Sequence, residues 1–123
     1  MKKILYHFSD YDFKILKPDF FGKNSYTKND LKFPLKRFFA YDVKKPLEYI
    51  FKASSFVYSF SLPENKIYNL ETDILKIKEK FNYDIDLILE YLSKKFVCVS
   101  YLTSFKTYVI FKSIKPLSKE KRF

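Results

Sequence analysis

The chain has 123 residues, of which 47% are hydrophobic, including 15 Phe and 11 Tyr. This many large apolar side chains exclude a disordered chain, and the length fits one domain over residues 1–123. With one Gly, one Cys and one His, the sequence also excludes glycine-rich phosphate loops, internal disulfides and zinc clusters. We expect no bound metal, and a buried, unreactive thiol at Cys98.

The formal net charge is +10 and is unevenly distributed. Residues 1–52 hold 12 Lys and Arg against 6 Asp and Glu, residues 53–93 hold 4 against 7, and residues 94–123 hold 8 against 1. Such a charge favours nucleic acid, an acidic protein face or a phosphorylated cofactor as partner. A merely solvated lysine surface is the alternative.

No apolar stretch approaches the roughly 20 residues that a membrane span needs. The first residues include two lysines but lack the apolar core and the cleavage site of a signal peptide. We therefore expect a cytoplasmic protein with no membrane partner.

The strand pattern is clearest at Phe56, Tyr58, Phe60 and Leu62, which alternate along one face. The expected elements, in chain order, are strands over 3–8 and 37–42, a helix beginning near Pro46, strands over 55–62 and 66–70, helices over 72–81 and 84–95, and strands over 96–102 and 108–112. Residues 113–123 are expected to be a basic tail. This order predicts an α+β fold with helices between two groups of strands.

Capping residues define the two later helices. Thr72 is expected to cap the first, with Ile74, Leu75 and Ile77 facing inward, and Asp84 is expected to cap the second.

Several short motifs resemble the ADP-ribosyltransferase-like superfamily, in particular its small bacterial and phage-type members. The opening Leu5-Tyr6-His7-Phe8-Ser9, followed by Phe13-Lys14-Ile15-Leu16-Lys17-Pro18, is similar to their first strand. Residues 20–30 resemble a loop of these proteins, residues 37–41 their Arg-Phe-Phe-Tyr-like strand, and residues 108–116 their closing strand.

The resemblance implies two small sheets that form a cleft for NAD, with flanking helices. It implies that His7 bonds an NAD ribose, and that Phe39 or Tyr41 stacks on nicotinamide. Tyr6 and Tyr26 complete the expected NAD-binding set.

One position departs from the family pattern. Thr107 stands where the family has its catalytic acid, and no Asp or Glu occurs between Tyr91 and Glu120. Loss of such a charge-stabilising group costs on the order of 100–1000-fold in rate. Glu64 or Glu71 could supply an acid from another element, so the catalytic residues stay unassigned.

The missing acid favours a scaffold that binds and inhibits or modulates a protein or ribonucleoprotein partner, as anti-defence proteins of phages and mobile elements do. An active mono-ADP-ribosyltransferase that uses NAD to modify a protein or RNA is the alternative, and nucleic acid is an alternative partner. The expected partner contacts are basic: Lys36, Arg37, Lys112, Lys115, Lys119, Lys121 and Arg122.

Overall fold

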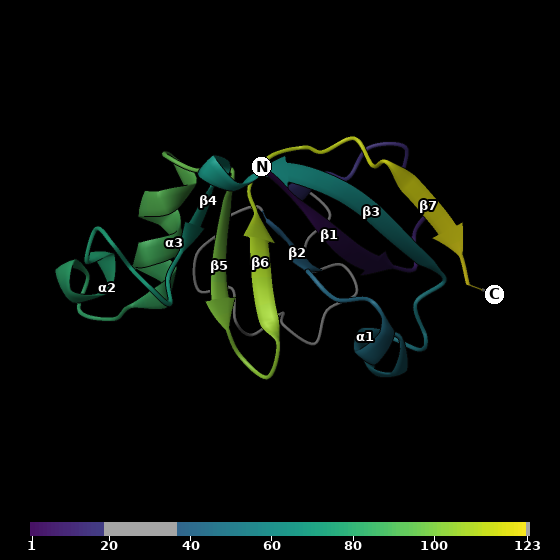
Figure 1. Cartoon of the computed structure of the whole chain (residues 1–123), viewed down its shortest axis with the longest axis horizontal. Helices are drawn as coiled ribbons and strands as arrows, with labels where there is room; N and C mark the ends of the chain where they lie inside the picture. Colours follow the sequence, from purple (N-terminus) through teal and green to yellow (C-terminus); the bar gives the residue numbers. More distant parts are fainter. Residues whose placement is uncertain (19–36, 123) are drawn as a thin grey trace.

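The computed structural model describes residues 1–18 and 37–122, which contain one curled sheet of seven strands and a few short helices (Figure 1). The strand order across the sheet is β4-β5-β6-β2-β1-β3-β7. All neighbouring strands are antiparallel except β4 and β5, which are parallel. The strands are β1 (Lys2–Ser9), β2 (Phe38–Tyr41), β3 (Phe56–Pro63), β4 (Ile67–Asn69), β5 (Cys98–Leu102), β6 (Lys106–Ile110) and β7 (Ser118–Lys121).

The expected division into two small sheets with a cleft between them is wrong. The short strand β2 pairs with β1 on one side and with β6 on the other, so both groups of strands join into a single sheet. The three expected helices are present but short: α1 (Lys45–Ile50), α2 (Ile77–Lys80) and α3 (Ile85–Ser93), with the 3-10 turn η3 (Glu64–Lys66) in addition.

One face of the sheet carries a continuous apolar core. Side chains in a strand alternate between the two faces, and the predicted inward face of β3 lies here, with Leu5 opposite Phe60 and His7 opposite Tyr58. The buried members of this cluster come from the five strands β5, β6, β2, β1 and β3 and from one loop: Leu5, Leu16, Phe38, Ala40, Tyr58, Phe60, Leu62, Cys98, Tyr108 and Ile110. We use the name concave face for the side of the sheet that carries this cluster.

The opposite, convex face carries two separate clusters. Ile88, Leu89 and Leu92 of α3 pack with Val99 and Val109 over one half of the sheet. Over the other half, Leu47 of α1 packs with Phe8 and Val57, and Phe51 and Phe105 contact this group. The helices thus cover the convex face only, at two places.

The helix caps confirm one prediction and correct another. Asp84 caps α3, accepting hydrogen bonds from the backbone N–H groups of Asp86 and Leu87. The helix expected over 72–81 begins only at Ile77, with Asp73 rather than Thr72 accepting bonds from its first turn. As a result, Ile74 and Leu75 are 83% and 56% exposed instead of facing inward.

Asp73 is held as an anion by its surroundings. Burial alone would raise the pKa of this carboxyl, but hydrogen bonds from the Tyr68 hydroxyl and from the backbone of Lys78 and Ile77 outweigh it and lower the pKa. The start of α2 is therefore tied to β4 through Tyr68.

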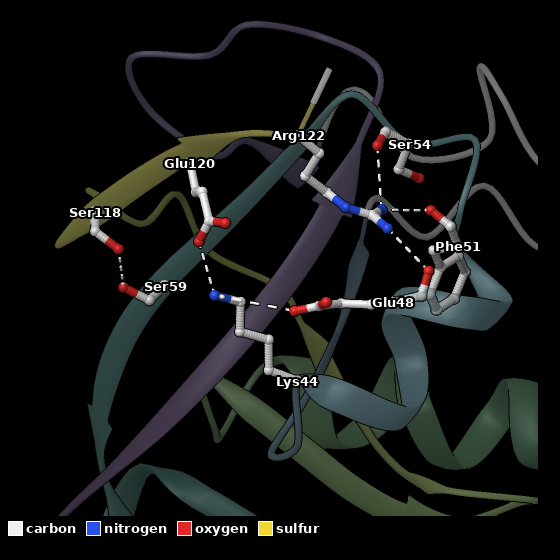
Figure 2. A network of polar contacts seen from close by, with 8 residues as sticks. All are labelled: Lys44, Glu48, Phe51, Ser54, Ser59, Ser118, Glu120 and Arg122. Atoms are coloured by element: carbon white, nitrogen blue, oxygen red, sulfur yellow. Dashed lines mark hydrogen bonds and ion pairs between the residues drawn. The ribbon is translucent and has the colours of Figure 1, made fainter.

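The C-terminal strand β7 lies at one edge of the sheet, and all four of its side chains are exposed. Figure 2 shows the polar contacts that fix it. Glu120 accepts a hydrogen bond from Lys44 Nζ at 2.7 Å, and the Ser118 and Ser59 hydroxyls bond to each other. The residue after the strand, Arg122, turns its guanidinium toward the end of α1 (Figure 2).

Arg122 makes three hydrogen bonds to backbone carbonyls. Its Nη1 donates to Phe51 O at 2.5 Å and to Ser54 O at 3.1 Å, and its Nη2 donates to Glu48 O at 2.8 Å. The last carbonyls of a helix have no partner within the helix, and a cation there also matches the helix dipole. The guanidinium also lies 5.4 Å from the centre of the Phe8 ring. Arg122 therefore joins β7, α1 and β1.

We predict that Arg122→Met lowers the free energy of unfolding by about 2–3 kcal/mol, because charge-assisted hydrogen bonds are lost and partly buried carbonyls are left without them. The matched control is Lys121→Met, one residue earlier and exposed, which should change stability by less than about 0.5 kcal/mol. Urea unfolding measures both. Equal effects of the two substitutions would contradict the role assigned to Arg122.

Candidate functional site

The side chain of His7 lies on the concave face and is half-buried in the core. Its ring packs edge-on against Phe38, with centroids 5.0 Å apart, and lies beside Tyr58. Nδ1 is 2.5 Å from Phe39 O, and since a carbonyl only accepts, Nδ1 carries the proton. Burial lowers the pKa of His7 to about 4, although the hydrogen bond to Phe39 acts in the opposite direction. His7 is thus a neutral core histidine at pH 7.

The other expected NAD contacts do not share that surface. Tyr6 and Tyr41 are directly opposite each other on β1 and β2, and their side chains pack in the convex cluster around Leu47. Phe39 packs against the other convex cluster. Tyr26 lies outside the described residues. The sheet itself separates His7 from the aromatic side chains expected to work with it, and NAD binding stays a prediction.

Thr107 is buried and makes only local contacts. Its hydroxyl donates to Phe105 O at 3.2 Å and lies 3.3 Å from the Thr103 hydroxyl, within the β5–β6 turn. Thr107 is opposite Tyr41 in the ladder, so its side chain is on the convex face, away from His7. Burial, followed by the effect of Tyr101, raises the pKa of Tyr41 to about 12.

A small open pocket with a volume of about 160 Å³ lies at the other end of the concave face. Two ion pairs border it: Lys3 with Asp42 at 3.6 Å, and Lys106 with Glu71 at 3.5 Å. The Tyr108 hydroxyl donates to Asp42 at 3.2 Å, and burial together with that carboxylate raises the pKa of Tyr108. The lining residues are Lys3, Glu64, Ile67, Asn69, Ser100, Lys106 and Tyr108.

This pocket is a weak candidate for a ligand site. Its volume is below the roughly 300–1,000 Å³ of typical small-molecule sites, and its two lysines are already paired with carboxylates. Glu64 and Glu71, the two acids that could have replaced the missing one, are both beside this pocket and not beside His7.

The structure divides the predicted basic contacts into two groups. Arg37 is buried, Arg122 bonds to backbone carbonyls, and the Lys119 ammonium forms an ion pair with Asp12. Lys36 lies outside the described residues. Lys112, Lys115 and Lys121 are exposed, so these three remain as contacts for a partner.

An isolated β-bridge places Lys14 and Lys17 near two of these exposed lysines, Lys112 and Lys115. Leu16 and Ile114 exchange backbone hydrogen bonds, each 2.9 Å long, and both side chains belong to the concave core. The lysines that flank them, Lys14 and Lys17 in one segment and Lys112 and Lys115 in the other, are all exposed. We call Lys14, Lys17, Lys112 and Lys115 the basic cluster.

Lys14 and Lys17 were not among the sequence-predicted contacts. The signal was present in the sequence, because apolar residues flanked by lysines occur both at 14–17 and at 112–115. The two bridged residues, Leu16 and Ile114, are 98 positions apart in the sequence, so neither pattern by itself predicts that the two segments lie side by side.

Three further features bear on a functional role: the Cys98 thiol, possible groups of metal ligands and possible membrane-spanning helices. Cys98 is buried, as predicted, and burial raises the pKa of its thiol. Over residues 1–18 and 37–122, no three His, Cys, Asp or Glu side chains come together to hold a metal ion. In the same part of the chain, no helix is long and apolar enough to cross a membrane.

No family model, curated protein or solved structure matches this chain. The resemblance to ADP-ribosyltransferase-like proteins stays a prediction. We therefore infer the function from the residues exposed at the surface of the molecule.

We predict that His7 makes the free energy of unfolding decrease as the pH is lowered. The folded state prefers the neutral ring, whose pKa is about 4, whereas the unfolded chain binds a proton below pH 6.5. The stability that this preference contributes is complete above pH 6.5 and is lost as the pH falls toward 4, by about 3 kcal/mol in all.

His7→Gln has no such titration, so its unfolding free energy should fall less steeply over this pH range than that of the wild type. Urea unfolding at several pH values measures both slopes. Parallel curves for the two proteins would show that the ring is accessible to protons in the folded state.

Proposed function

We propose that this chain is a binding protein for a macromolecular partner with negative charge, and that the basic cluster is the contact surface. The observation that carries the proposal is the Leu16–Ile114 bridge, which holds two lysine-rich segments from opposite ends of the chain side by side.

The charge of the cluster is available to a partner. Three lysines elsewhere in the structure are neutralised internally: Lys3 by Asp42, Lys44 by Glu120 and Glu48, and Lys106 by Glu71. Within the part of the chain that the structure describes, no carboxylate pairs with a lysine of the basic cluster.

Holding like charges together costs electrostatic free energy, and an anionic partner removes that cost. Packing of Leu16 and Ile114 in the core accounts for the bridge itself, and the proposal gives a role to the exposed lysines that flank it. Inhibition of the partner, as in anti-defence proteins of phages and mobile elements, is the expected consequence of such binding and stays a prediction.

Two matched charge reversals test the proposal. Lys17→Glu/Lys115→Glu alters the basic cluster, whereas Lys52→Glu/Lys66→Glu makes the same change in net charge at two exposed lysines elsewhere. The probes are heparin, a duplex DNA and a polyglutamate peptide, with affinity measured between about 50 and 200 mM salt.

We expect the wild type to bind at least one of these polyanions with steep salt dependence. The cluster reversal should weaken binding roughly tenfold more than the control reversal does, and should reduce the salt slope by about two. Equal effects of the two reversals would show that net charge alone is responsible. No binding to any of the probes would contradict the proposal directly.

A further inference from the structure

The edge strand β7 offers backbone groups for pairing. Arg122 N donates to Ser55 O at 2.7 Å, continuing the register in which Glu120 is opposite Val57. Along an antiparallel ladder, every second residue directs its N–H and C=O toward the neighbouring strand. Ser118, Glu120 and Arg122 therefore face β3, and the N–H and C=O groups of Lys119 and Lys121 face away from the sheet.

This edge is held in place before any partner arrives. The contacts drawn in Figure 2 fix β7 at both ends, through Ser118 with Ser59 and through Arg122 with the end of α1, and in the middle through Glu120 with Lys44. A strand with no buried side chain gains nothing from the core, so β7 is held by its backbone pairing with β3 and by these side-chain contacts. A preorganised edge costs less entropy on binding than a flexible one.

We propose that β7 binds an extended acidic segment of a protein partner, which adds to the sheet as a further strand. This inference rests on the proposed function, because it takes the negative charge of the partner from there. Added strands gain affinity from backbone hydrogen bonds, which here would be made to Lys119 and Lys121.

The side chains of β7 define what the added strand should carry. Lys119 and Lys121 lie on one face, opposite Tyr58 and Phe56. The Lys119 ammonium is paired with Asp12, so it is Lys121 that calls for Asp or Glu beside it in an added strand. Ser118 and Glu120 lie on the other face, which suits uncharged polar residues. Acidic residues beyond the start of β7 would approach the basic cluster, whose Lys115 precedes the strand by three residues.

A second copy of this chain fits the edge poorly. Two β7 strands paired antiparallel would bring Lys119 and Lys121 of one copy against the same lysines of the other, and like charges on paired strands are destabilising. Lysines on an edge strand are a common protection against this kind of self-association.

The test uses a peptide of alternating Glu and Thr and the full chain labelled with 15N. Two versions of the peptide carry N-methyl groups on alternate residues: one set blocks the N–H groups that face β7, and the other set blocks those that face away. We expect the parent peptide to shift and protect the amides of Lys119 and Lys121. The version blocked toward β7 should bind at least tenfold more weakly than the version blocked on the far side.

Two substitutions give the same test on the protein side. Lys121→Pro removes an N–H that faces outward and leaves the bonds to β3 in place, whereas Lys121→Gln removes the charge and keeps the N–H. Peptide binding should fall much more in the first variant than in the second. The peptide versions decide the question if Lys121→Pro does not fold.

Four outcomes would overturn this inference. Equal binding of both N-methylated peptides, with the amides of Lys119 and Lys121 unchanged, would mean that acidic partners bind by side-chain charge alone, and the proposed function would stand. Binding of duplex DNA but of no acidic peptide would make nucleic acid the partner. Dimerisation that Lys121→Pro abolishes would make a second copy the occupant of the edge. Absence of binding to every polyanion would refute the proposed function as well.

Discussion

A strand whose side chains are all exposed cannot be held by the hydrophobic effect, so β7 depends on polar contacts, above all on the three hydrogen bonds that Arg122 makes to carbonyls at the end of α1. These bonds fix the last residues of the chain on the convex side. The Leu16–Ile114 bridge fixes the segment that precedes β7. Between them, the C-terminal segment has a defined path along the edge of the sheet.

This path brings exposed lysines from two distant segments together. Lys3, Lys44 and Lys106 are paired with Asp42, Glu120 and Glu71, and the guanidinium of Arg122 is hydrogen-bonded to carbonyls. The bridge holds the segment with Lys14 and Lys17 beside the segment with Lys112 and Lys115, and the second of these segments leads into β7. His7, by contrast, is a neutral side chain in the core. The surface at the edge of the sheet is therefore better suited to function than the centre of the sheet.

Local patterns were sufficient to predict most elements. The alternation along 56–62 placed β3 and its inward face correctly, and Asp84 correctly marked the start of α3. The prediction of two sheets was wrong because strand pairing is long-range. The residues in and around Phe38–Tyr41 do not indicate that this strand pairs with a neighbour on each side. For the same reason, the sequence could not separate Arg122, which caps α1, from lysines that stay exposed, or assign His7 and Tyr41 to opposite faces.

Amide hydrogen exchange at Leu16 and Ile114 tests the account most directly, because the bridge between them is what assembles the basic cluster. Both amides should exchange slowly in the wild type. In Arg122→Met, protection should fall at Leu16, Ile114 and Leu117 but not at Val109 in the centre of the sheet, since exchange reports local opening. Fast exchange at Leu16 and Ile114 in the wild type would mean that the two segments are not held together, and would contradict the account.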